Sequence, residues 1–129
     1  MKKLKVAFAT DDGKSFMGRH FGDAEHYYIY EIDNNNADFI KKIDNTTEKE
    51  KIHADPKKAK GITNLLSEEN VNVVVSKIFG PNINRIKKKF VCIVVKDEKN
   101  EKSINNICDN MENIFREWEK GKERKHLSF

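Results

Sequence analysis

Short apolar runs divide this chain and predict its strands. Leu4, Val6 and Phe8 alternate with mostly small residues, which predicts a central strand over Leu4–Thr10, covered on both faces. Aromatic and β-branched residues fill 27–32, and 37–43 follows after a turn of Asp and Asn, so the two segments predict a hairpin. Two further apolar runs, 71–75 and 91–95, predict buried strands.

Helical spacing appears in the stretches between and after these later strands. Asp55-Pro56 is typical of a helix start, with Asp as N-cap and Pro in the first turn, and the apolar spacing ends near Asn70. A Gly80-Pro81-Asn82 break precedes a short amphipathic helix over 83–90. One long C-terminal helix over 103–120 is predicted by a single apolar stripe: Ile104, Ile107, Cys108, Met111, Ile114, Phe115 and Trp118.

The order of these elements predicts the fold class. Strands separated by helices imply a parallel sheet with helices on both faces, and the hairpin adds an antiparallel strand. We expect a single three-layer α/β/α domain over residues 1–118, with a mixed sheet of about five strands. Residues 119–129 are expected to form a charged, frayed tail, in which Leu127 and Phe129 have no explanation.

Composition and charge narrow the function classes. The chain has 129 residues, 37% hydrophobic and 36% charged, with a net charge of +4. Lysines are interleaved with acids, so a run such as 87–89 indicates a solvated helix face rather than a nucleic-acid site. The first apolar run is far shorter than the ~20 residues of a membrane span, and we expect a cytoplasmic protein. Cys92 and Cys108 form no Cys-x-x-Cys pair, which argues against a disulfide framework and a self-contained zinc or iron–sulfur site.

The loop that follows the first strand is the candidate functional element. It carries three glycines (Gly13, Gly18 and Gly22), which favour tight turns or positive φ, together with Lys14, Arg19 and His20. Carboxyl ends of parallel strands gather binding loops, so this loop should meet the turn over 76–82 and residues 96–97. The alternative is an ordinary surface loop in which Asp-Gly marks a turn.

Four features resemble the dinitrogenase iron–molybdenum cofactor biosynthesis family. They are Ala-Thr-Asp-Asp-Gly over 9–13, His20-Phe21-Gly22 before an aromatic strand, the run 73–75 leading into Gly80-Pro81-Asn82, and a short helix followed by an apolar strand. The resemblance covers about residues 3 to 95 and implies a ribonuclease-H-like fold with a mixed five-stranded sheet. It implies a non-catalytic carrier for an iron–sulfur or iron–molybdenum cofactor precursor, with cofactor-assembly proteins as partners.

An anionic, sulfide-rich cluster needs a borderline ligand, nearby positive charge and free backbone N–H groups. The residues expected to bind the cofactor are Asp12, Gly13, Lys14, Arg19, His20, Phe21, Gly22, Gly80 and Asn82. Candidate metal ligands are His20, His53 and Cys92, although His20 and His53 also fit solvated loop residues and Cys92 fits a small buried hydrophobe. Cys108, Phe115 and Trp118 are expected in the core.

Two other classes stay open. A ribonuclease-H-like sheet suggests a two-metal nuclease, for which Asp11 and Asp12 stand after the first strand and Glu31 and Asp97 are possible companions. A metal-free interaction or regulatory module would instead use the Lys/Glu-rich last helix as a partner surface. The exposed hairpin could pair with another chain.

Overall fold

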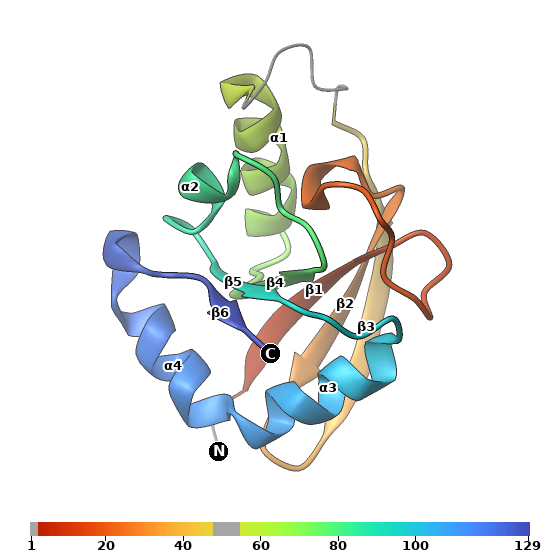
Figure 1. Cartoon of the computed structure of the whole chain (residues 1–129), viewed down its shortest axis with the longest axis vertical. Coiled ribbons are helices and arrows are strands. Elements are labelled where there is room, and N and C mark those ends of the chain that lie inside the picture. Colours follow the sequence, from red (N-terminus) through yellow and green to blue (C-terminus); the bar gives the residue numbers. More distant parts are fainter. Residues whose placement is uncertain (1–2, 48–54) are drawn as a thin grey trace.

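The computed structural model describes residues 3–47 and 55–129. Its sheet has six strands in the order β3-β2-β1-β4-β5-β6 (Figure 1). The strands are β1 (Leu4–Thr10), β2 (His26–Ile32), β3 (Ala37–Asp44), β4 (Val73–Ser76), β5 (Val91–Val94) and β6 (Leu127–Ser128). Only β2 runs against its neighbours, because it is antiparallel to β1 and β3 while β1, β4, β5 and β6 are parallel. The mixed sheet with one antiparallel strand is therefore confirmed, with six strands instead of about five.

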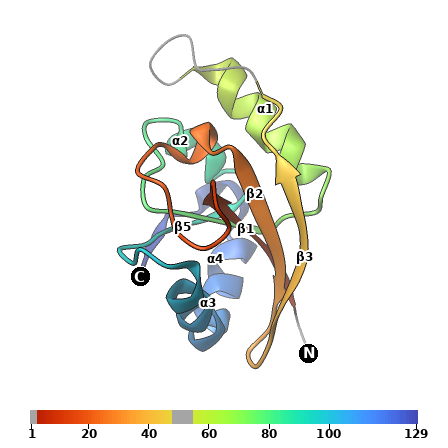
Figure 2. The same cartoon turned by 90° about the vertical axis from the view of Figure 1, so that its right-hand side faces the viewer.

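Two pairs of helices cover the two faces of the sheet. These are α1 (Pro56–Ser67) and α2 (Ile83–Ile86) on one side, and α3 (Asn100–Asp109) and α4 (Met111–Glu119) on the other (Figure 2). Ala7 and Ala9 of β1 pack toward α1 and α2, whereas Val6 and Phe8 pack toward α3 and α4, and all four are completely buried. Burial on both faces explains the apolar composition of β1 and confirms the three-layer arrangement.

The helix predicted from Asp55-Pro56 is present and begins as expected. The Asp55 carboxylate accepts a hydrogen bond of 3.0 Å from the Lys57 N–H, which satisfies one donor of the first turn. Ile62 and Leu66 then face the core, one turn apart.

The C-terminal helix differs from the prediction because it divides at Asn110. The backbone of Asn110 leaves the helical region at φ −118° and ψ 20°, and its side-chain amide donates to the Asn106 carbonyl over 2.7 Å. Ile107, Met111 and Ile114 remain buried across the break. The apolar stripe therefore continues through two helices, and periodicity alone does not reveal the break.

The expectation of a frayed tail over 119–129 is wrong. After α4, a 3-10 turn η2 (Gly121–Glu123) leads into β6, which pairs with β5 through Leu127 and Ile93. Leu127 and Phe129 pack against the core on the α3–α4 side, and the Phe129 N–H donates to the Val94 carbonyl over 3.0 Å. The charged residues of this segment conceal a strand whose apolar contacts come from only two side chains.

In the described part of the chain, no helix combines the length and apolarity that crossing a membrane requires.

Candidate functional site

Backbone hydrogen bonds join the long loop between β1 and β2 to the segments that follow the parallel strands at their carboxyl edge. The Phe16 N–H donates to the Glu98 carbonyl after β5 (2.9 Å), and the Phe21 N–H donates to the Ile78 carbonyl after β4 (2.8 Å). The three segments expected to meet at this edge therefore do so.

The Thr-Asp-Asp-Gly motif builds the first half of this loop. Asp12 Oδ1 accepts hydrogen bonds from the N–H groups of Lys14 and Ser15, both at 2.8 Å, and these bonds lower the pKa of the Asp12 carboxyl. The Thr10 hydroxyl donates to the Ser15 carbonyl over 2.5 Å and accepts from the Gly13 N–H over 3.1 Å. Asp12 thus stabilises a local turn, and its carboxylate oxygen is used by the loop itself.

Asp11 joins the two ends of the loop. Its carboxylate accepts from the Glu25 N–H over 2.9 Å and pairs with the Arg19 guanidinium at 2.7 Å. Burial alone would raise the pKa of Asp11, but these hydrogen bonds and the Arg19 charge outweigh it and lower the pKa. Arg19 was expected to offset cluster charge, yet its own charge is compensated by Asp11.

The structure separates the predicted site residues into two groups. Gly13 and Lys14 lie against the start of α3, where the Asn100 N–H donates to the Lys14 carbonyl (2.9 Å). Gly13 adopts φ +80°, and a Cβ there would lie 2.5 Å from the Tyr28 ring. His20 and Gly22 instead lie against the turn after β4 and against α1. Lys14 is therefore not placed beside His20.

His20 packs directly on the backbone of Gly80. A Cβ at Gly80, which has φ +73°, would lie 2.5 Å from His20 Nδ1 and 2.7 Å from Cε1. The face of the imidazole ring therefore lies over Gly80, with Nδ1 nearest to it. His20 is partly buried, and within residues 3–47 and 55–129 neither ring nitrogen forms a hydrogen bond or ion pair. The described residues therefore leave both ring nitrogens open to an external ligand.

A small hollow, which we call the His20 hollow, lies beside this imidazole. It holds only about 10 Å³ of space for the centre of a water molecule, enough for a single water. Its lining comes from the loop, from α1 and from the turn before α2: His20, Gly22, Asp23, Lys58, Ala59, Ile62, Phe79, Pro81, Asn82 and Ile86.

Lys58 is one of the lining residues that the sequence analysis missed. Only 7% of it is exposed, and its ammonium donates to the Thr47 hydroxyl over 2.7 Å. The signal was present in the sequence, because Lys58 stands four and eight residues before Ile62 and Leu66 on the buried face of α1. A lysine on an apolar helical stripe indicates an unusual environment.

Phe21 and Gly22 hold the turn that carries His20. Phe21 is completely buried and stacks on Phe79 with ring centroids 5.1 Å apart. The Tyr27 hydroxyl donates to the Phe21 carbonyl over 2.7 Å, and burial raises the pKa of Tyr27, so that it remains a neutral donor. The Asn45 amide donates to the Gly22 and Ala24 carbonyls, both at 2.8 Å. Burial and hydrogen bonding therefore fix the position of His20.

Asn82 connects the turn after β4 to the start of α1. Its amide donates to the Asp55 carbonyl over 3.1 Å and its carbonyl oxygen accepts from Arg85 over 3.1 Å. With 7% of its surface exposed, Asn82 supports the wall of the His20 hollow.

The other two predicted metal ligands do not join His20. His53 lies outside the described residues. Cys92 is fully buried in the core between the sheet and α1–α2, and burial raises the pKa of its thiol to about 12. A thiol there is a core side chain, since the thiolate that binds metals is disfavoured. No group of three or more His, Cys, Asp or Glu side chains suited to an ion occurs among the described residues.

The acids of the nuclease alternative are not brought together. Glu31 pairs across the sheet with Lys5, at the opposite end of β1 from Asp11, and forms an ion pair with Lys3 (3.5 Å). Asp97 interacts with Asn106 and Lys102 near α3.

Solved structures share this fold. The crystal structure of a proposed dinitrogenase (MJ0327) from Methanocaldococcus jannaschii is 23% identical, with a TM-score of 0.61 over 85% of this chain and 92% of that one. The solution NMR structure of the same protein gives 23% identity and a TM-score of 0.63 over 86% and 92%. Identity this low establishes the fold alone.

A comparison with curated proteins finds no significant match. The family model described as dinitrogenase iron–molybdenum cofactor matches residues 2–113, which is most of the chain. The protein thus belongs to the dinitrogenase iron–molybdenum cofactor family.

Proposed function

We propose that this protein is a non-catalytic carrier that holds an iron–sulfur or iron–molybdenum cofactor precursor at His20. The observation that carries the proposal is the state of the imidazole: it is fixed against Gly80, and neither ring nitrogen has a partner within the described residues. Neutral imidazole is a good ligand for iron, and a fixed ring loses little freedom on binding.

The small size of the His20 hollow supports surface binding of the cargo. A space for a single water cannot enclose a cluster, so the cargo would rest on the rim and make one bond to the His20 imidazole. A single protein ligand at an open rim permits release, which a carrier requires.

The positive charge beside this cargo would come from Lys58 rather than from Lys14 and Arg19. Lys58 lines the His20 hollow, whereas Arg19 and Lys14 do not. A mostly buried ammonium is weakly screened by water and salt, so its attraction for an anionic cluster is larger than that of an exposed lysine.

The proposed partners are the proteins that assemble the cofactor, which would deliver the cargo to this protein and receive it from this protein.

The test is anaerobic addition of iron–molybdenum cofactor to the wild-type protein and to His20→Ala. Bound cluster should appear as visible absorbance that co-elutes with the wild-type protein in gel filtration. We expect His20→Ala to lose at least about tenfold in affinity, because one metal–ligand bond contributes well over about 1.4 kcal/mol. His126→Ala, which removes an exposed imidazole from the segment before β6, is the matched control and should bind like the wild type.

Equal binding by wild type and His20→Ala would overturn the assignment of the ligand. Absence of cluster binding by the wild type would instead favour a metal-free module. Mg²⁺-dependent cleavage of nucleic acid that Asp11→Asn abolishes would favour the nuclease alternative.

A further inference from the structure

A second hollow lies between α1 and the segment that begins with α2, and the charged residues that the structure places in its lining are all cationic. We call it the basic groove. Its volume is about 310 Å³, and its lining residues are Pro56, Ala59, Lys60, Thr63, Asn64, Arg85 and Lys89. The sequence analysis interpreted the lysine run over 87–89 only as a solvated helix face. The structure brings Lys89 from that run and Lys60 of α1 to the same groove.

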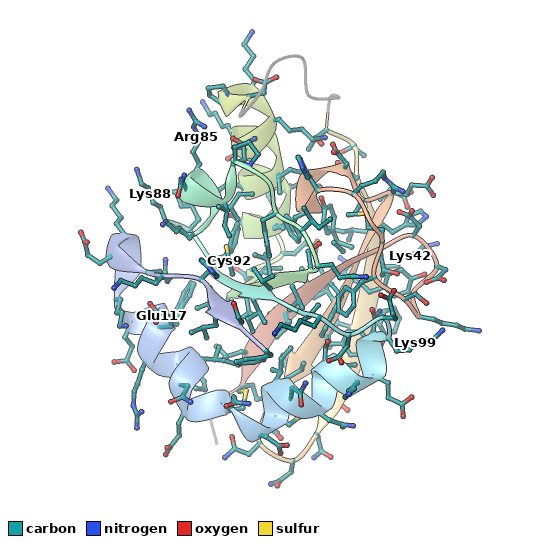
Figure 3. The ribbon with its side chains drawn as sticks, in the orientation of Figure 1. Lys42, Arg85, Lys88, Cys92, Lys99 and Glu117 are labelled. Atoms are coloured by element: carbon teal, nitrogen blue, oxygen red, sulfur yellow. The ribbon has the colours of Figure 1, made fainter. Side chains whose placement is uncertain are left out.

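Among the described residues, no acidic side chain lines the basic groove. Lys60 and Lys89, which line the groove, and Lys88, which precedes Lys89 outside the lining, are exposed, and none of them forms an ion pair within the ranges 3–47 and 55–129. Elsewhere on the surface, lysines such as Lys41, Lys77 and Lys120 are paired with carboxylates. Figure 3 shows Arg85 and Lys88 extending from the same side of the molecule, away from Lys42 and Lys99. The groove therefore carries a concentrated positive potential.

Part of the lining of the basic groove is apolar. Pro56 and Ala59 contribute a ring and a methyl group, and Thr63 follows one turn later on α1. A lining that combines apolar and cationic side chains suits an acidic polypeptide segment that carries a small aliphatic anchor. Nucleic acid is the weaker fit, because single strands are bound by stacking on aromatic rings and none of the aromatic residues that the structure describes lines this groove.

We infer that the basic groove docks an acidic, aliphatic-containing segment of a partner protein. The groove and the His20 hollow are both lined by Ala59, so a partner seated there would lie next to the proposed cargo site. The inference does not depend on what His20 binds, since its residues are other than His20 and Lys58. Charge complementarity would speed association and make it sensitive to salt.

The test is an NMR titration of the full chain with a peptide of about 12 residues, built from glutamates with two leucines. Amide signals of Lys60, Thr63 and Lys89 should shift, and the shifts should weaken as salt is added. The double variant Lys60→Glu/Lys89→Glu should bind at least about tenfold more weakly. The same reversal at Lys42 and Lys96, exposed lysines outside the groove, is the matched control and should leave binding unchanged.

Three results would overturn the inference. They are shifts centred away from α1 and α2, an equal loss in the Lys42→Glu/Lys96→Glu control, and tighter binding of a single-stranded oligonucleotide at the same residues. Cluster binding by the Lys60→Glu/Lys89→Glu variant is measured in parallel. Retained cluster binding with lost peptide binding would support a docking surface that is separate from the cargo site.

Discussion

At the scale of single residues, Gly80 determines the position of the His20 imidazole, the proposed metal ligand. Its φ of +73° belongs to a region that residues with a Cβ adopt at a cost, and its missing side chain is the space into which the His20 ring fits. A glycine in one segment therefore positions an imidazole in another, which is a contact across the sheet edge rather than along the chain.

Gly80→Ala is expected to disturb both stability and cargo binding. The added Cβ would lie 2.5 Å from His20 Nδ1, so the ring must move, and the left-handed backbone should cost about 1–2 kcal/mol of unfolding free energy. Urea unfolding and cluster binding measure the two effects. Gly18→Ala is the matched control, because Gly18 has no positive φ and a Cβ added there would meet no atom within 4 Å. Wild-type behaviour of Gly80→Ala would contradict the packing described.

Sequence reasoning placed His20, Gly22, Gly80 and Asn82 in one candidate site with Gly13 and Lys14, whereas the structure places Gly13 and Lys14 elsewhere, beside α3. Residue type and order indicate which side chains can bind an anion, whereas distances across the sheet edge decide which of them meet. The compensation of Arg19 by Asp11 and the burial of Lys58 are likewise tertiary facts. Of these two features, the burial of Lys58 is the one that the sequence indicates, because this lysine stands on the apolar stripe of a predicted helix.

At the scale of elements, the β1–β2 loop is ordered by its own acids. Asp12 organises the first turn, and Asp11 ties the loop to its last residues through Arg19 and the Glu25 N–H. The acids that could suggest a metal-dependent nuclease therefore have structural partners.

The strands β1 to β5 and the first helix could be predicted from the sequence because their apolar spacing is local. The break at Asn110 and the two-residue β6 depend on tertiary contacts that leave no periodic pattern in the sequence.

The acid sensitivity of the loop tests this role of Asp11. Its pKa in the folded protein lies below the ordinary value of 3.8, so its stabilisation is complete above about pH 4 and is lost as pH falls through the lower, folded value. Near pH 6 we expect Asp11→Asn to reduce the unfolding free energy by about 0.5–1 kcal/mol, and the difference from wild type should shrink at about pH 2.

Urea unfolding at the two pH values measures the change. The control is Asp38→Asn on β3, an exposed carboxylate without an ion pair in the part of the chain that the structure describes. A pH-independent difference between wild type and Asp11→Asn would contradict an ionic role for Asp11.

At the scale of the whole molecule, the two edges of the sheet are protected from pairing with another strand in different ways. The β3 edge carries Lys41 and Lys42 and a register shift opposite Ile29 and Tyr30, features that oppose pairing with another strand. The opposite side of β5 is covered by β6, which the chain supplies from its last residues. The C-terminal segment thus completes the sheet instead of trailing from it.

Arg124 is the residue that secures this cover. It is 7% exposed, donates to the Trp118 carbonyl over 2.8 and 3.1 Å and to the Lys88 carbonyl over 3.0 Å, and lies 4.3 Å from the centre of the Trp118 ring. Arg124→Met keeps most of the aliphatic stem but removes these donors, and should cost about 2 kcal/mol of unfolding free energy. Arg124→Lys should not restore it, because an ammonium cannot reproduce the planar fork that reaches both carbonyls.

Loss of this anchor should also release β6 and expose the polar edge of β5. We therefore expect Arg124→Met to show faster amide exchange at Phe129, whose N–H bonds to Val94, and concentration-dependent association in sedimentation velocity. Lys125→Met, an exposed neighbour in the same segment, should remain like wild type in both measurements. An Arg124→Met variant that keeps slow exchange at Phe129 and stays as monodisperse as the wild type would mean that β6 is held by Leu127 and Phe129 alone.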